Sequence, residues 1–153
     1  MNKLSIVFTF LVFTVTASAF AQTNEEESIK KTINQLFEGM RKSDSTLVKN
    51  AFHHGAILHT IAKNKEGTTA VKSSDLSAFI TSIAKPHPEV YDERIAFTKI
   101  LIDANLASVW TDYKFYIGDK FSHCGVNSFQ LVKLSDSWKI VYLIDTRRKD
   151  NCN

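Results

Sequence analysis

The sequence lacks the motifs that would assign it to several large functional classes. It has no glycine-rich phosphate loop and none of the nucleophile motifs of serine or cysteine enzymes. Its two cysteines lie far apart and its histidines are not paired at metal-ligand spacing, so we expect no metal site. Its charges are dispersed rather than gathered into a basic stripe with interleaved aromatic residues, so we expect no nucleic-acid partner.

Long apolar runs are equally scarce, and the only one lies at the N-terminus. Met1-Asn2-Lys3 gives a basic start, Leu4 to Val15 is mostly apolar, and Ala19-Phe20-Ala21 precedes a polar residue. This order is typical of a secretory signal peptide. The run is too short for a transmembrane helix and is interrupted by threonine and serine.

We therefore predict a signal peptide over residues 1–21 and a single domain over residues 22–153, which is periplasmic or secreted. No later segment is apolar enough to span a membrane, so we expect no membrane contact after cleavage. Loss of Lys3 would lower the net charge from +3 to +2. No repeat, low-complexity tract or interdomain linker divides the domain.

Cysteine is limited to Cys124 and Cys152. In an exported protein an even number of cysteines favours a disulfide. The alternative is one buried thiol and one thiol in a frayed tail. A bridge would hold the C-terminal tail along the sheet and would stabilise the domain by about 3.5 kcal/mol in the chain-entropy account.

The domain itself shows three helical patterns followed by strands. The helices are expected over residues 25–42, from Ser43 or Asp44 to about Asn50, and from Ser74 or Asp75 to the proline at 86. Residues 52–55 are expected to form a turn between helix and strand. The strands are expected at residues 56–62, 68–71, 91–102, 106–118, 120–134 and 137–148.

This order predicts an α+β fold in which a cone-shaped, curved antiparallel sheet wraps around three N-terminal helices. A cone of this kind has an open mouth that can hold a small molecule.

The order, the length, the phrase at residues 51–56 and the closing hairpin at 129–140 resemble the nuclear-transport-factor-2-like superfamily, which includes ketosteroid isomerases and SnoaL-like polyketide cyclases. Phe52-His53 and Asp145-Thr146-Arg147 are similar to its exported bacterial group described as putative lumazine-binding. The resemblance covers essentially the whole mature chain. It implies the cone fold and a small-molecule ligand, and homodimers through the sheet are common in the superfamily.

Hairpin turns predict which residues face each other. A two-residue turn at Asp119-Lys120 places Trp110 opposite Phe129 and Tyr116 opposite His123. A turn at Ser135-Asp136 places Phe129 opposite Tyr142 and Leu131 opposite Ile140. We predict that one side of the sheet binds the ligand, through Trp110, Asp112, Tyr116, His123, Asn127, Phe129 and Tyr142. A slip of one residue would exchange the two sides.

Two residues of this set are candidate catalytic groups. Burial among aromatic rings would raise the pKa of Asp112 and make it a general base or a neutral donor. Alternatively it is a rim carboxylate that faces water and is paired with Lys114 or Lys99. His123 could exchange protons near neutral pH, or simply bond a neighbouring hydroxyl. Asp145 and Arg147 could form a surface pair, or Arg147 could reach a ligand anion.

Three functions remain open at this point. The first is an exported domain that binds a small molecule in an aromatic-lined pocket, for example a lumazine- or flavin-like heterocycle. The second is a SnoaL-like isomerase, cyclase or dehydratase that uses Asp112 or His123 as acid or base. The third is a non-catalytic domain that forms a homodimer through the sheet. We expect no cofactor for any of them.

Overall fold

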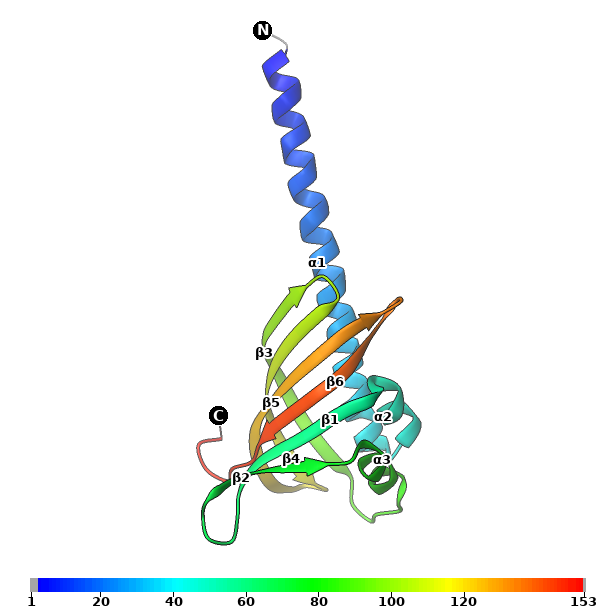
Figure 1. Ribbon diagram of the computed structural model, residues 1–153, viewed down its shortest axis with the longest axis vertical. Helices are drawn as coiled ribbons and strands as arrows, with labels where there is room; N and C mark the ends of the chain where they lie inside the picture. Colours follow the sequence, from blue (N-terminus) through cyan, green and yellow to red (C-terminus); the bar gives the residue numbers. More distant parts are fainter. Residues whose placement is uncertain (1–2, 153) are drawn as a thin grey trace.

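The computed structural model describes the backbone of residues 3–152 and the side chains of residues 23–152. Its elements follow the predicted order (Figure 1). They are α1 Lys3–Lys42, α2 Ser45–Ala51, β1 Phe52–Lys63, β2 Thr69–Ser74, α3 Leu76–Ala84, β3 Tyr91–Asp103, β4 Leu106–Ile117, β5 Lys120–Leu134 and β6 Ser137–Thr146. The predicted α+β class, with a curved sheet around helices, is confirmed.

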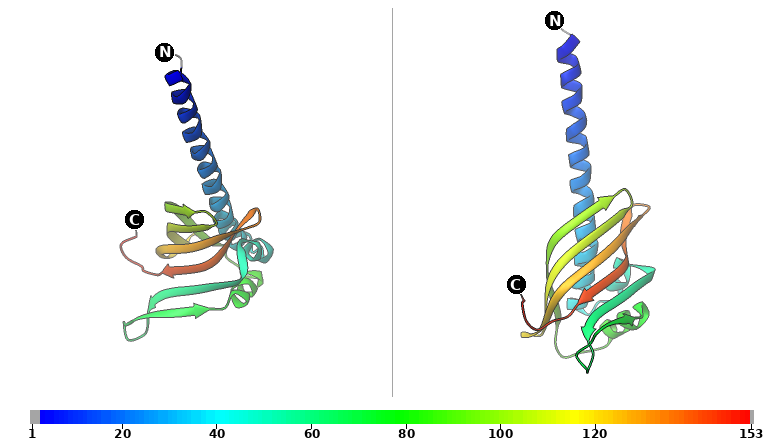
Figure 2. Two further views of the ribbon diagram at one scale, coloured as in Figure 1. Left: turned by 45° about the horizontal axis from the view of Figure 1, so that its top comes forward. Right: turned by 60° about the vertical axis from the view of Figure 1, so that its left-hand side comes forward.

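The first half of α1 projects beyond the sheet, and its second half lies against the concave face (Figures 1 and 2). The predicted signal peptide, residues 1–21, falls on residues whose side chains lie outside the described part of the chain, so it stays a prediction. Within the described residues, no helix combines the length and the apolar character needed to cross a membrane.

The six strands of the described chain form one sheet in the order β2-β1-β6-β5-β4-β3. Neighbouring strands are antiparallel except β1 and β6, which are parallel. No hairpin joins β1 to β6, so no tight turn forces these two strands to run in opposite directions. Residues 52–55, predicted as a turn, are instead the start of β1, whose register with β6 shifts between Phe52 and Ile57.

The core lies between the concave face of the sheet and the second half of α1. The predicted apolar stripe of α1 is fully or almost fully buried: Ile29, Ile33, Leu36, Phe37 and Met40. It packs on buried sheet residues that include Phe129, Leu131 and Ile140. The three- and four-residue spacing of the stripe is therefore explained by a single helix face that covers the sheet.

Aspartates begin the two shorter helices. The Asp44 carboxylate accepts hydrogen bonds from the amides of Thr46 and Leu47, and the Asp75 carboxylate accepts one from the amide of Ala78. These bonds satisfy amides that have no partner inside the helix. Of the two capping residues that the sequence allowed at each helix, the aspartate fills the role in both cases.

The predicted pairing of β4 with β5 is wrong by one residue. The turn is at Gly118-Asp119, because Ile117 pairs with Lys120, and an extra residue, Ser122, bulges out of the ladder beyond it. Displacement of the turn alone would preserve the faces, since it changes the register by two residues. The bulge shifts the register back by one residue, which leaves a net change of one, and this exchanges the two faces of β4 relative to β5.

Val109, rather than Trp110, therefore lies opposite Phe129. Val109 and Tyr113 are buried, whereas Trp110 is 49% exposed. The turn at Ser135-Asp136 and the pairing of Leu131 with Ile140 are confirmed. A second bulge follows, however, and Tyr142 pairs with Gln130 instead of Phe129.

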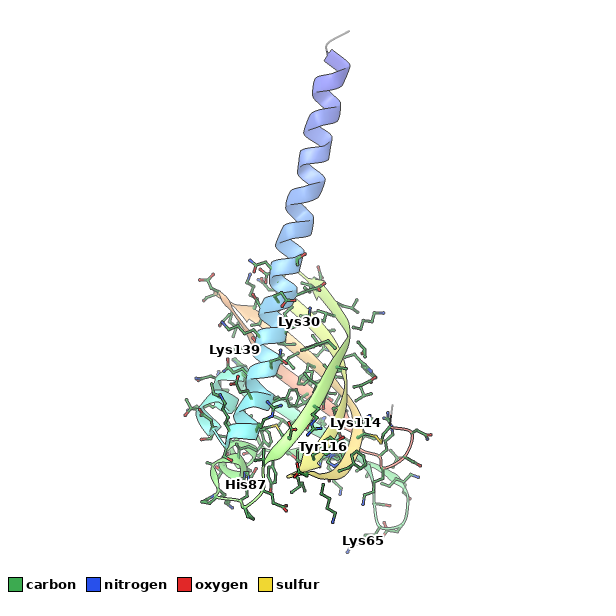
Figure 3. The ribbon with its side chains drawn as sticks, turned by 180° about the vertical axis from the view of Figure 1, so that it is seen from behind. Lys30, Lys65, His87, Lys114, Tyr116 and Lys139 are labelled. Carbon is green, nitrogen blue, oxygen red and sulfur yellow. A yellow bond between two sulfur atoms is a disulfide. The ribbon has the colours of Figure 1, made fainter. Side chains whose placement is uncertain are left out.

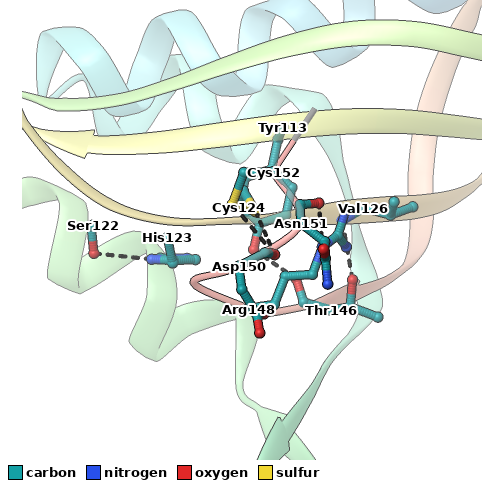
Figure 4. The surroundings of a disulfide bond; sticks show 10 residues. All are labelled: Tyr113, Ser122, His123, Cys124, Val126, Thr146, Arg148, Asp150, Asn151 and Cys152. Atoms are coloured by element: carbon teal, nitrogen blue, oxygen red, sulfur yellow. Dashed lines mark hydrogen bonds between the residues drawn. A yellow bond between two sulfur atoms is a disulfide. The ribbon is translucent and has the colours of Figure 1, made fainter.

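The predicted disulfide between Cys124 and Cys152 is present, with its Cα atoms 5.8 Å apart (Figure 4). It holds the C-terminal tail beside β5. The backbone of Arg148 bonds that of Cys124 in both directions, at 2.9 Å. The tail thereby continues the line of β6 past its end, and this fixes the position of Arg147.

Candidate functional site

A cavity of about 120 Å³ lies inside the cone, between the second half of α1, α3 and the concave face of the sheet. One part of its wall is apolar: Leu36, Phe37, Met40, Leu58, Phe79 and Leu143. The other part is polar: His59, Thr60, Ser74, Glu93, Tyr113, His123, Asn127, Asp145 and Arg147. Apolar walls with a few converging polar groups are typical of small-molecule sites.

The central polar contact joins Glu93 of β3 to Asn127 of β5. The Asn127 amide nitrogen donates to the Glu93 carboxylate at 2.8 Å, and it lies 3.4 Å from the Thr111 hydroxyl. Asn127 is 3% exposed, and Glu93 is partly buried. These two side chains give the cavity an edge that can both accept and donate hydrogen bonds.

Burial raises the pKa of Glu93 to about 7. The negative charge of Asp145 also raises it, whereas the hydrogen bond from Asn127 and the positive charge of Arg147 oppose the increase. Desolvation is the largest cause, because the ionised carboxylate loses more free energy of hydration than it gains from Asn127 and Arg147. Glu93 is therefore able to exchange a proton close to neutral pH.

Asp145 of β6 is a second carboxylate at the cavity and is tightly held. It accepts hydrogen bonds from the Thr60 hydroxyl at 2.6 Å, the Tyr113 hydroxyl at 3.3 Å and the Arg147 Nε at 3.0 Å. Burial raises the pKa of Tyr113, with the charges of Asp145 and Glu93 adding to the effect, so its hydroxyl stays neutral. The suggestion that Asp145 forms a surface pair with Arg147 is half right: the pair exists, but Asp145 is only 9% exposed.

His123 lines the same cavity from β5. Its ring packs edge-on against Tyr113, and its Nδ1 lies 3.0 Å from the Ser122 hydroxyl (Figure 4). Burial lowers the pKa of His123, and the charge of Arg147 lowers it further. The imidazole is therefore neutral at neutral pH, and it can accept or donate a hydrogen bond but adds no positive charge.

Of the seven predicted ligand-binding residues, three lie on the concave side: His123, Asn127 and Phe129. Phe129 belongs to the core beneath the cavity. The four others belong to the opposite side of the sheet because of the two bulges: Trp110, Asp112, Tyr116 and Tyr142. Asp112 is therefore not ringed by Trp110, Phe129 and Tyr142 inside the cone, and the aromatic environment predicted for it is absent.

Sequence reasoning missed Glu93 and Tyr113 as site residues. Glu93 pairs with Phe115 and Ile95 pairs with Tyr113, so alternate residues of β3 and β4 face the cone. A polar residue at an inward position of β3 was the available signal. It could be used only with the correct register, because the opposite face of the same strands is also partly apolar.

Within the described residues, no group of three or more histidines, cysteines, aspartates or glutamates is placed to hold a metal ion. A family model described as putative lumazine-binding matches residues 24–143. A search of curated proteins finds no match.

Solved structures share the fold at low sequence identity. An NTF2-like protein of unknown function from Shewanella baltica is 20% identical, with a TM-score of 0.65, covering 84% of this chain and 97% of its own. An NTF2-like protein with a cystatin-like fold from Novosphingobium aromaticivorans is 9% identical, with a TM-score of 0.70, covering 90% and 91%. Identities this low establish the fold alone.

Proposed function

The chain belongs to the family described as putative lumazine-binding, and we propose that it is an exported domain that binds a small heterocycle inside its cone. The N-terminal sequence pattern and the disulfide support export. The cavity supports the ligand class, because its apolar walls suit a flat ring and its polar edge suits ring nitrogens and carbonyls.

The observation that carries this proposal is the hydrogen bond between Asn127 and Glu93 at the cavity wall. A lumazine-like ring presents adjacent N–H and C=O groups. A carboxylate can accept from the N–H, and an amide can donate to the C=O, so the two side chains match this edge. The volume of about 120 Å³ is smaller than the ~300–1,000 Å³ of drug-sized sites, which favours one or two rings over a three-ring flavin.

Fluorescence titration of the mature protein with lumazine tests the proposal. We expect Glu93→Ala and Asn127→Ala to weaken binding by about 1–3 kcal/mol, because each leaves a polar group of the ligand unpaired. Trp110→Ala is the matched control: it changes a predicted ligand residue on the convex face and should leave the affinity unchanged. Loss of binding in Trp110→Ala alone would place the site on the other face.

A second candidate function is acid–base catalysis, which the pKa of Glu93 near 7 favours. Glu93, rather than Asp112, would then transfer the proton, and the neutral His123 would donate a hydrogen bond to the developing oxyanion. If the bound molecule that co-purifies from the periplasm is converted on incubation, turnover should decrease by roughly 100-fold or more in Glu93→Gln. An unchanged turnover rate in this variant would exclude the assignment.

The convex face of the sheet supports a third proposal, the homodimer. It carries large exposed apolar side chains, among them Trp110, Leu101 and Leu106 at 49%, 55% and 48% exposure. Exposed apolar patches commonly mark association surfaces. Light scattering should then give a dimer for the mature protein and a monomer for Trp110→Glu.

A further inference from the structure

A second hollow, of about 410 Å³, lies between α1 and β3, next to the cone cavity. The two hollows share Phe37 and Glu93 in their linings, so they adjoin at these two side chains. β3 is the edge strand of the sheet, and in the described chain no further strand covers this side. Figure 3 shows β3 running beside α1 when the molecule is seen from behind.

Two arginines line this hollow, Arg41 from α1 and Arg94 from β3. The Nε of Arg41 donates to one oxygen of Asp92 at 2.8 Å, and the Nε of Arg94 donates to the other at 2.7 Å. The Arg94 guanidinium also lies over the Tyr116 ring, 4.2 Å from its centroid. One carboxylate and one ring therefore hold both guanidinium groups in place.

The terminal nitrogens of these arginines are available. Among the described side chains, neither arginine donates a hydrogen bond through its terminal nitrogens, since both bonds to Asp92 use Nε. The side chains of Arg41 and Arg94 are 47% and 59% exposed, whereas that of Asp92 is 15% exposed. A ligand in the hollow can thus reach the donors without displacing the carboxylate that orients them.

The charges at this hollow leave an excess of positive charge when Glu93 is neutral. Lys42 is paired with Glu38, and Arg41 and Arg94 share the single charge of Asp92. Glu93, the remaining acid, bonds Asn127 in the cone. Arginine is well suited to bind carboxylate or phosphate, because its planar donors can form two parallel hydrogen bonds.

We propose that the ligand site continues from the cone into this hollow, and that the ligand carries an acidic group, a carboxylate or phosphate, bound by Arg41 and Arg94. The inference rests on the proposed function, because it assumes that the ring of the ligand occupies the cone. It adds the class of ligand: a small ring with an anionic tail that passes Glu93. It also accounts for a cone cavity that is small on its own.

The test compares two ligands that differ only in charge: lumazine with a carboxypropyl chain, and its uncharged carboxamide. We expect the acid to bind the mature protein about tenfold more tightly at low salt, as for hydrogen bonds to a charged group. The difference should disappear in the double variant Arg41→Gln/Arg94→Gln. It should persist in the control Lys72→Gln, which removes an exposed charge from β2.

A variant that keeps the charge separates anion recognition from folding. In Arg41→Lys/Arg94→Lys, Asp92 retains cationic partners, so the domain should unfold at a similar temperature, while the preference for the acid should decrease because the planar donors are lost. Equal binding of acid and amide by the wild-type protein would overturn the inference and leave the proposed function intact.

Inorganic phosphate provides a readout that does not need the ring. Its titration should shift the Nε–H signals of Arg41 and Arg94 in a saturable manner, with no such shift from added chloride at the same ionic strength. If plain lumazine does not bind, the proposed function fails, and the phosphate titration still decides whether the hollow binds anions. No saturable shift would refute the anion site.

Discussion

The concave and convex faces of the sheet are made from the same strands but have opposite properties. On the concave face Phe129 and Thr111 are completely buried, and the polar groups that are present bond one another. On the convex face Trp110 is half exposed, among exposed apolar neighbours. Because both faces are rich in apolar residues, composition alone cannot tell which one faces the helices. The pleat and the bulges decide it.

The largest expected effect comes from a substitution at Gly125, where β5 closely approaches the backbone at Thr146, the last residue of β6. A Cβ added at Gly125 would overlap the carbonyl of Thr146 and lie 2.7 Å from Cε1 of Tyr113. Gly125→Ala should therefore cost more than about 4 kcal/mol or prevent folding. Gly55→Ala is the control, since its nearest neighbour would be 3.5 Å away. Urea denaturation measures both, and equal stability of the two variants would contradict the close approach.

Truncation of one aromatic side chain on each face compares the two faces by their effect on stability. Phe129→Ala removes a fully buried ring and should lower the free energy of unfolding by about 3–5 kcal/mol. Trp110→Ala removes a larger ring from the convex face and should nevertheless change the free energy of unfolding by about 0.5 kcal/mol or less in the monomer. Denaturant unfolding at a low protein concentration distinguishes them. A larger loss in Trp110→Ala would mean that the faces have been assigned the wrong way round.

Removal of the disulfide tests how the tail supports the concave site. Cys124→Ser/Cys152→Ser should lower stability by about 3.5 kcal/mol for a closed loop of this size. Hydrogen exchange at the amides of Cys124 and Arg148, which pair with each other's carbonyls, should become faster than at the amides of the central sheet. Unchanged protection of these two amides would show that the backbone hydrogen bonds between Cys124 and Arg148 hold the tail without the disulfide.

The smallest expected effect is a dependence of stability on pH that belongs to the concave face alone. Glu93 has a pKa of about 7 in the folded protein and an ordinary value of 4.5. Between these values the folded protein binds more protons than the unfolded chain, so stability decreases as pH rises through this window, by about 2–3 kcal/mol.

Glu93→Gln should remove most of this decrease, and Glu66→Gln, in the loop between β1 and β2, should not. Thermal unfolding between pH 4.5 and 8 gives the comparison. The same pH dependence of stability in the wild-type protein and in Glu93→Gln would contradict the burial of Glu93.

Much of the fold follows from local patterns. The apolar stripe of α1, the caps at Asp44 and Asp75 and the turn at Ser135-Asp136 each depend on a few neighbouring residues, and each is present as expected. The candidate site was predicted less well. His123 and Asn127 line the cone cavity, but Asp112 and Trp110 lie on the opposite face of the sheet, and Glu93 was not recognised.

The sequence by itself determined the order of elements, the buried face of α1 and the pairing of its two cysteines. Periodicity, helix capping and cysteine count are properties of short segments or of composition, so they can be read without the tertiary structure. Only the tertiary structure decided which side chains of β4 face the inside of the cone. A single extra residue at Ser122 exchanges the faces, and only the observed pairing of β4 with β5 reveals it. Strand pairing also brings Glu93 of β3 to Asn127 of β5, 34 residues along the chain, and forms the polar edge of the candidate site.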